Sequence, residues 1–132
     1  MVPPAVFAEL SAGSAAHPEI DAVLNSAWLE VRTLSQPENI TELLLSLDLG
    51  ESEAIQLAQE MHAEFLLIDE RDGRHAALAR GIRVIGVAGI LLNARKSVLL
   101  GPLRPIFESL VHELDFHIQW SIVETLLKEV GE

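Results

Sequence analysis

The chain has 132 residues, of which 49% are hydrophobic and 22% are charged, and its formal net charge is −11. These proportions are typical of a globular protein and exclude a disordered or fibrous one, and the length predicts a single domain over residues 1–132. The negative charge argues against a protein that simply coats DNA or RNA, because its field repels phosphate unless cations or a local basic patch intervene. It is compatible with a carboxylate site for a divalent metal ion or with a surface that receives a basic partner.

The sequence shows no feature of membrane insertion or secretion. Its longest uninterrupted apolar stretches, such as residues 65–68, are far shorter than the roughly 20 residues of a membrane-spanning helix. The first residues lack the basic and apolar regions of a secretory signal, and no cysteine is present to form a disulfide. We therefore expect a cytoplasmic protein with no transmembrane segment.

Helical patterns recur along the whole chain. Pro3 and Pro4 precede the first of them, and proline is favoured in the first turn of a helix. Residues 47–51 open a longer helix, which the spacing of its apolar residues predicts to bury Ala54, Leu57, Ala58 and Met61. Further helices are predicted at residues 18–25, 41–45, 74–80, 88–96, 105–114 and 119–130.

Strands are predicted at residues 28–34, 65–69, 82–87 and 116–118. Residues 65–69 are a continuous apolar run that ends in a carboxylate, as expected of a strand buried on both faces of a parallel sheet. This strand, the helix after it and the next strand form a unit whose crossover should be right-handed. The alternation predicts an α/β fold, a three-layer α/β/α sandwich with a parallel sheet.

Three acidic residues are candidates for a functional site: Glu9, Glu53 and Asp69. Asp69 is the first choice because open parallel sheets bind ligands beyond the carboxyl ends of their strands. Each has a simpler interpretation. Asp69 would cap the next helix, Glu9 would be an exposed helix glutamate, and Glu53 would border a solvated face. Asp48 and Glu51 fit a capping box, so a structural role explains both.

The charged residues after Asp69 allow two interpretations. The simple one is a solvated loop. In the functional one, Asp72 adds to a metal site while Arg71 and Arg74 contact phosphate, for which the planar guanidinium is well shaped.

Other common kinds of site have no support in the sequence. The five histidines show no metal-ligand spacing, and the absence of cysteine excludes the usual zinc sites. No glycine fingerprint for nucleotides and no Gly-x-Ser-x-Gly motif is present.

Three segments, residues 2–10, 47–55 and 66–71, resemble in this order a VapC-like branch of the PIN-domain family. The resemblance continues through residues 83–87 and the leucine-rich helix after them. It implies an α/β/α sandwich and a Mg²⁺- or Mn²⁺-dependent ribonuclease acting on RNA, of the kind often held inactive as a toxin by a small antitoxin. It also implies that Glu9, Glu53 and Asp69 are the catalytic and metal-binding residues. Clustered carboxylates hold hard divalent cations, which activate water and stabilise charge on phosphate.

One departure from the family pattern has consequences. Family members open with a strand that bears an aspartate, followed by a helix, whereas Met1 here lies almost on the proline-valine-glutamate segment. We therefore expect an N-terminally truncated fold, with activity weakened or lost, and with unpaired strand edges that favour a homodimer or higher oligomer. The alternative function is a non-catalytic binding or assembly module for a basic protein partner.

Overall fold

The computed structural model describes residues 1–132, which divide into two compact units, Met1–Ile85 and Gly86–Glu132. The first unit contains, in chain order, α1 (Pro4–Gly13), α2 (Glu19–Leu24), the 3-10 helices η1 (Pro37–Ile40) and η2 (Leu43–Leu45), α3 (Leu49–Glu60), β1 (Leu66–Leu67), α4 (Arg71–Ala79) and β2 (Val84–Ile85). The second contains α5 (Val87–Lys96), α6 (Arg104–His112) and α7 (Trp120–Glu129). None of these helices has the length and apolar character needed to cross a membrane.

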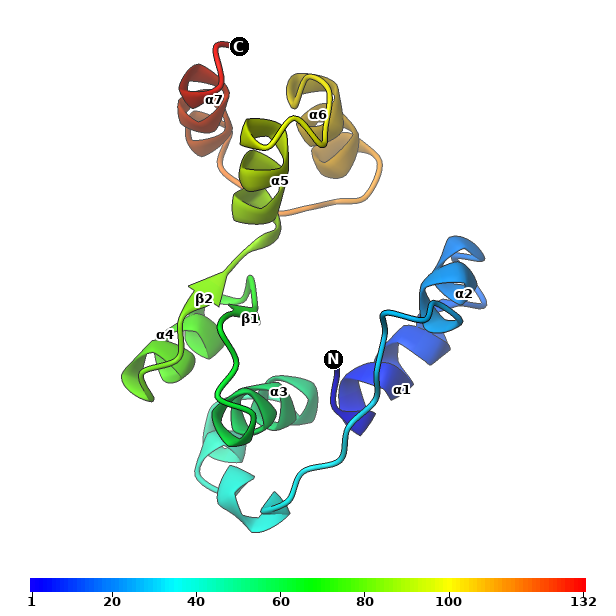
Figure 1. Cartoon of the computed structure of the whole chain (residues 1–132), viewed down its shortest axis with the longest axis vertical. Coiled ribbons are helices and arrows are strands. Elements are labelled where there is room, and N and C mark those ends of the chain that lie inside the picture. The colour runs from blue at the N-terminus through cyan, green and yellow to red at the C-terminus, as the bar shows by residue number, and fades with distance from the viewer. The chain divides into compact units, whose positions relative to one another are not determined.

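The predicted helices are present with small differences at their ends, except that residues 41–45 contain only the short 3-10 helix η2. Pro4 is the first residue of α1, where its missing N–H costs nothing, and α1 contacts both α2 and α3 (Figure 1). At the start of α3, Asp48 Oδ1 accepts a hydrogen bond from Glu51 N–H at 2.8 Å, and Glu51 Oε2 accepts one from Asp48 N–H at 3.4 Å. The predicted capping box is therefore confirmed.

The strand–helix–strand unit is confirmed as β1, α4 and β2. The two strands are parallel, with Leu66 opposite Val84, and Leu66 N–H donates to the Arg83 carbonyl at 2.8 Å. The chain therefore has an α/β fold with a small parallel sheet. The three-layer arrangement stays a prediction. The prediction that the first strand is buried on both faces was wrong, because Phe65 and Leu67 are 48% and 54% exposed. The sheet ends at β1, so no further strand covers them.

Two predicted strands do not form. Within residues 28–34 the only pairing is an isolated parallel bridge between Val31 and Val2. The ladder stops there because Pro3 has no N–H and α1 follows at once. Residues 116–118 are irregular, because Phe116 N–H donates to the Leu110 carbonyl at 2.9 Å and so ends α6 instead of joining a ladder.

Each unit has its own buried cluster of apolar side chains. In the first unit the largest fully buried member is Ile55 of α3, which packs with buried residues of η2 and α4 and with Ile68, just after β1. In the second, Leu103, Phe107, Val123 and Leu127 are fully buried where α5, α6 and α7 gather (Figure 1). The single domain over residues 1–132 stays a prediction.

Candidate carboxylate site and polar pocket

Glu53 links α3 to the first turn of α1. Its Oε2 accepts a hydrogen bond from the backbone N–H of Ala5 at 2.9 Å in a partly buried position. The first N–H groups of a helix have no partner within the helix, and a carboxylate there also meets the positive end of the helix dipole. The side chain of Glu53 is therefore held in place by the backbone of another helix, which a glutamate on a freely solvated face would not be.

Glu9 lies against the start of α3. A Cβ on Gly50 would stand only 2.5 Å from Glu9 Oε1, so the glycine makes room for this carboxylate. The two predicted glutamates, Glu9 and Glu53, are thus both at the contact between α1 and α3.

Asp69 lies at the carboxyl end of the sheet, as predicted, two residues after β1. The residue after it, Glu70, occupies the N-cap of α4 and makes no side-chain cap bond. Asp69 is exposed and does have an interaction partner. The structure therefore places Asp69 at the carboxyl end of the sheet, immediately before the N-cap residue of α4.

Glu9, Glu53 and Asp69 lie toward the same end of the first unit. A Cβ on Gly73 would be 2.5 Å from Ile68 Cδ1 and 3.1 Å from Glu51 Oε1, so the first turn of α3 adjoins the carboxyl end of β1. Even so, no three acidic or histidine side chains are close enough together to hold a metal ion. The donor chemistry suits a hard divalent cation, but the arrangement falls short of a complete ligand set.

The charged residues around α4 have separate roles. Arg74 Nη1 donates to the Ile68 carbonyl at 3.0 Å, so the fold itself uses this guanidinium. Arg71 and Asp72 are exposed in the first turn of α4. Burial first, and then the charges of Asp48, Glu70 and Asp72, raise the pKa of Glu51. Negative charge is therefore concentrated where α3 and α4 begin.

A family model described as a PIN domain matches residues 1–132, the whole chain. The chain belongs to the PIN-domain family. Comparison with curated proteins and with solved structures gave no significant match. Membership in this family points to a nuclease-like fold in general, and the carboxylates at the end of the sheet are where such chemistry would be sought.

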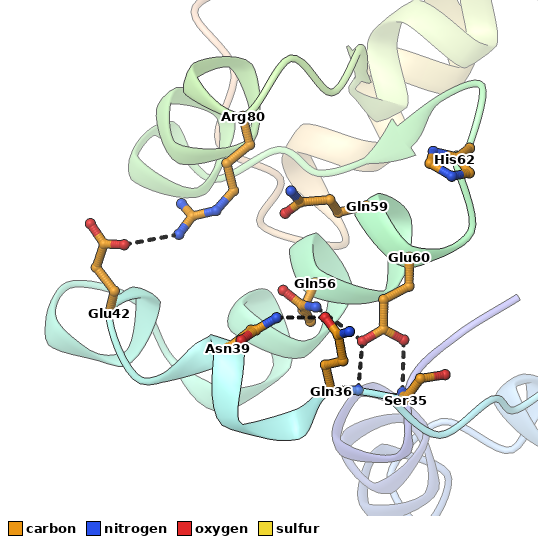
Figure 2. A pocket seen from close by; sticks show the side chains of 9 residues that line it. All are labelled: Ser35, Gln36, Asn39, Glu42, Gln56, Gln59, Glu60, His62 and Arg80. Atoms are coloured by element: carbon orange, nitrogen blue, oxygen red, sulfur yellow. Dashed lines mark hydrogen bonds and ion pairs between the residues drawn. The ribbon is translucent and has the colours of Figure 1, made fainter.

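This PIN domain also has a polar pocket of about 590 Å³ that the sequence did not predict (Figure 2). On one side Glu60 accepts hydrogen bonds from the N–H groups of Ser35 and Gln36, at 2.7 and 2.9 Å, and from Gln56 Nε2 at 3.0 Å. The Gln56 bond first, and then the backbone bonds, lower the pKa of Glu60. Across the pocket Arg80 reaches Glu42 at 3.4 Å. In the sequence, the spacing of Gln56, Gln59 and Glu60 on one helix face could have indicated part of this pocket. The other lining residues come from distant segments and could not be predicted in this way.

Proposed function

We propose that this protein is a metal-dependent ribonuclease of the VapC toxin type, a hydrolase of RNA phosphodiesters that uses Mg²⁺ or Mn²⁺, with activity weakened or lost in this form. The observation that supports it is the placement of Glu9 and Glu53 at one helix contact, with Asp69 at the adjoining end of the sheet, in a PIN domain. Carboxylates at the carboxyl end of a parallel sheet are well placed to meet a ligand.

The metal part of the proposal rests on donor chemistry. Mg²⁺ prefers carboxylate oxygens and keeps several waters, so one or two protein carboxylates can suffice to bind it. Catalysis requires more protein ligands to the metal than binding does, and no three such side chains lie close together in the chain. This shortfall is the reason for proposing weakened activity.

The proposal includes a cellular setting. A toxin of this type would act in the cytoplasm on RNA and would be restrained by a small antitoxin, and we also propose that the chain forms a homodimer or higher oligomer. The net charge of −11 supports a basic protein as the restraining partner. Arg71, exposed beside Asp72, remains available for a phosphate, whereas Arg74 is bonded to the backbone.

Cleavage of a labelled single-stranded RNA pool tests the function directly. The purified chain is assayed with Mg²⁺, with Mn²⁺ and with EDTA, beside Glu53→Gln and Asp69→Asn. Glu113→Gln, an exposed residue of the second unit, is the matched control. Slow cleavage that needs the metal and disappears in the two site variants is expected. Cleavage that persists in EDTA, or that all three variants retain, would contradict the assignment.

A second candidate function is a non-catalytic module that binds a basic protein. It is favoured by the incomplete carboxylate group together with the strongly negative chain. Complete absence of metal-dependent cleavage, combined with salt-sensitive binding to a basic polypeptide, would favour this candidate over the ribonuclease.

A further inference from the structure

The polar pocket of the first unit is separate from the carboxylate site. Its volume is about 590 Å³, which is enough for a small molecule, and Glu9, Glu53 and Asp69 do not line it. Its walls come from η1 and the residues beside it, from α3, and from the end of α4 (Figure 2). A ligand here would therefore contact residues to which the carboxylate site gives no role.

Gln56 supplies a buried hydrogen-bond acceptor to this pocket. The residue is only 4% exposed, and its Nε2 donates to Glu60 Oε1 at 3.0 Å, which leaves Oε1 as the acceptor. No group of the chain donates to this oxygen. The only fully enclosed side-chain atom without a partner is Ser52 Oγ, so Gln56 Oε1 still opens to the pocket. Acceptors in such positions are normally satisfied by water or by a ligand.

Arg80 supplies hydrogen-bond donors to the same pocket. Its side chain is 24% exposed, and its Nη2 contacts Glu42 Oε2 at 3.4 Å. Glu42 is mostly exposed, so this ion pair holds the guanidinium only weakly. The N–H groups on Nε and Nη1 of Arg80 make no hydrogen bond within the chain, and neither does the side-chain amide of Gln59. Unused donors and an unused acceptor thus line one pocket.

The charged groups of the pocket are already compensated within the chain. Glu60 accepts three hydrogen bonds, two from backbone N–H groups and one from a side-chain amide. Glu42 and Arg80 form an ion pair. An anion would meet both carboxylates and the field of a chain with a net charge of −11, whereas a cation would meet the guanidinium. The groups left for a ligand therefore suit an uncharged one.

The composition of the walls narrows the class of ligand further. No phenylalanine, tyrosine or tryptophan lines the pocket, although such rings are the usual support for a nucleobase. The walls are polar, so an apolar molecule would gain little from them. A hydroxyl group both donates and accepts, so a molecule with several hydroxyls can satisfy Gln56 Oε1 and the Arg80 N–H groups together.

We propose that this pocket binds a small neutral polyol, such as a monosaccharide, whose hydroxyl groups donate to Gln56 Oε1 and accept from Arg80 and Gln59. The ligand would connect α3 with the end of α4 across the pocket. The inference goes beyond the ribonuclease proposal and does not depend on it, because it invokes no metal, no RNA and no residue of the carboxylate site.

The test measures binding of glucose, galactose and mannose to the full chain by nuclear magnetic resonance, through the side-chain NH₂ signals of Gln56 and Gln59. The uronate and the 2-amino sugar of each hexose have the same ring with a negative or a positive charge, and they serve as matched controls. At least one hexose should shift both signals in a saturable manner. That hexose should bind more tightly than its own uronate and its own amino sugar.

Two variants and a matched control locate the site. Arg80→Met removes the donors and should weaken the hexose about tenfold. Gln59→Ala, at an exposed helix position where alanine is well tolerated, should cause a smaller loss. Arg83→Met, at an ion-paired arginine of the first unit outside the pocket, should leave the affinity unchanged. Thermal melts establish that each variant is folded.

Three results would overturn the proposal. The first is the absence of saturable binding by all three hexoses. The second is tighter binding of a uronate or an amino sugar than of its hexose, because the pocket would then select a charged ligand. The third is an affinity that Gln59→Ala and Arg80→Met leave unchanged, or that Arg83→Met lowers equally, because the hexose would then bind elsewhere.

Discussion

Glu53 on α3 accepts a hydrogen bond from the backbone N–H of Ala5 on α1, with 2.9 Å between Oε2 and N. A side chain that the sequence marked as a candidate ligand thus also joins two helices. The same bond fixes one oxygen of the carboxylate and leaves the other for a ligand. Structural and functional interpretations of this residue do not exclude each other.

Substitutions of Glu53 should separate its structural role from its charge. Glu53→Ala removes the partner of Ala5 N–H, and loss of such a cap costs about 1 kcal/mol. Glu53→Gln keeps an acceptor oxygen and should retain most of the stability. Urea unfolding measures both. If the two variants lose stability equally, the hydrogen bond to Ala5 is not what stabilises this contact.

Gly50→Ala should move the carboxylate of Glu9 without harming the helix. The new Cβ would stand 2.5 Å from Glu9 Oε1, the far end of a flexible side chain that can turn away. Alanine is favoured over glycine in a helix by up to about 1 kcal/mol, so the free energy of unfolding should be unchanged or slightly higher. Metal affinity should fall if Glu9 is a ligand. Strong destabilisation would show that Glu9 cannot be displaced.

Glu60 should make the first unit sensitive to acid. Because hydrogen bonds from Gln56 and from the backbone at Ser35 and Gln36 lower its folded pKa below 4.5, its contribution to stability is present above about pH 4.5. That contribution is lost as pH falls through the lowered pKa. Glu60→Gln should therefore lower stability at pH 7 and flatten its decline below pH 4.5. Parallel thermal melts of variant and wild type over this range test it, and identical pH profiles would contradict it.

Glu51 should have the opposite pH dependence. Its folded pKa is raised above 4.5, first by burial and then by the neighbouring Asp48. Its contribution is thus greatest below pH 4.5 and is lost as pH rises through the raised pKa. Glu51→Gln removes the charge yet keeps a residue suited to a capping box, so it should stabilise the protein at pH 7. Unfolding at pH 7 and below pH 4.5 measures this, and a variant less stable at pH 7 would refute it.

Local patterns predicted most of the secondary structure. The proline pair before α1, the Asp48 and Glu51 capping box and the apolar spacing of the helices act within a few residues, where sequence determines structure directly. The parallel pairing of β1 with β2 also followed from one apolar run and a helix of crossover length. The end of the sheet at which Asp69 lies could be predicted for the same reason.

The failures concern contacts between distant segments. The face of α3 that contains Leu57 and Met61 has the spacing of a buried face, yet Leu57 is buried and Met61 is exposed, because what a face meets depends on segments elsewhere. Residues 28–34 have strand-forming composition but gain a single bridge, to Val2. The spacing of Glu9, Glu53 and Asp69 along the chain likewise could not reveal how near their carboxylates come.

Binding of Mn²⁺ or Mg²⁺ tests the central claim most directly, through the melting temperature of the wild type and of Asp69→Asn. A metal that binds only the folded chain must stabilise it, so the account predicts a melting temperature that rises with metal concentration in the wild type. It also predicts a much smaller rise in Asp69→Asn, a nearly isosteric variant that stays folded and, with less carboxylate repulsion, is at least as stable without metal. No stabilisation of the wild type, or an equal rise in both proteins, would contradict a metal site at Asp69.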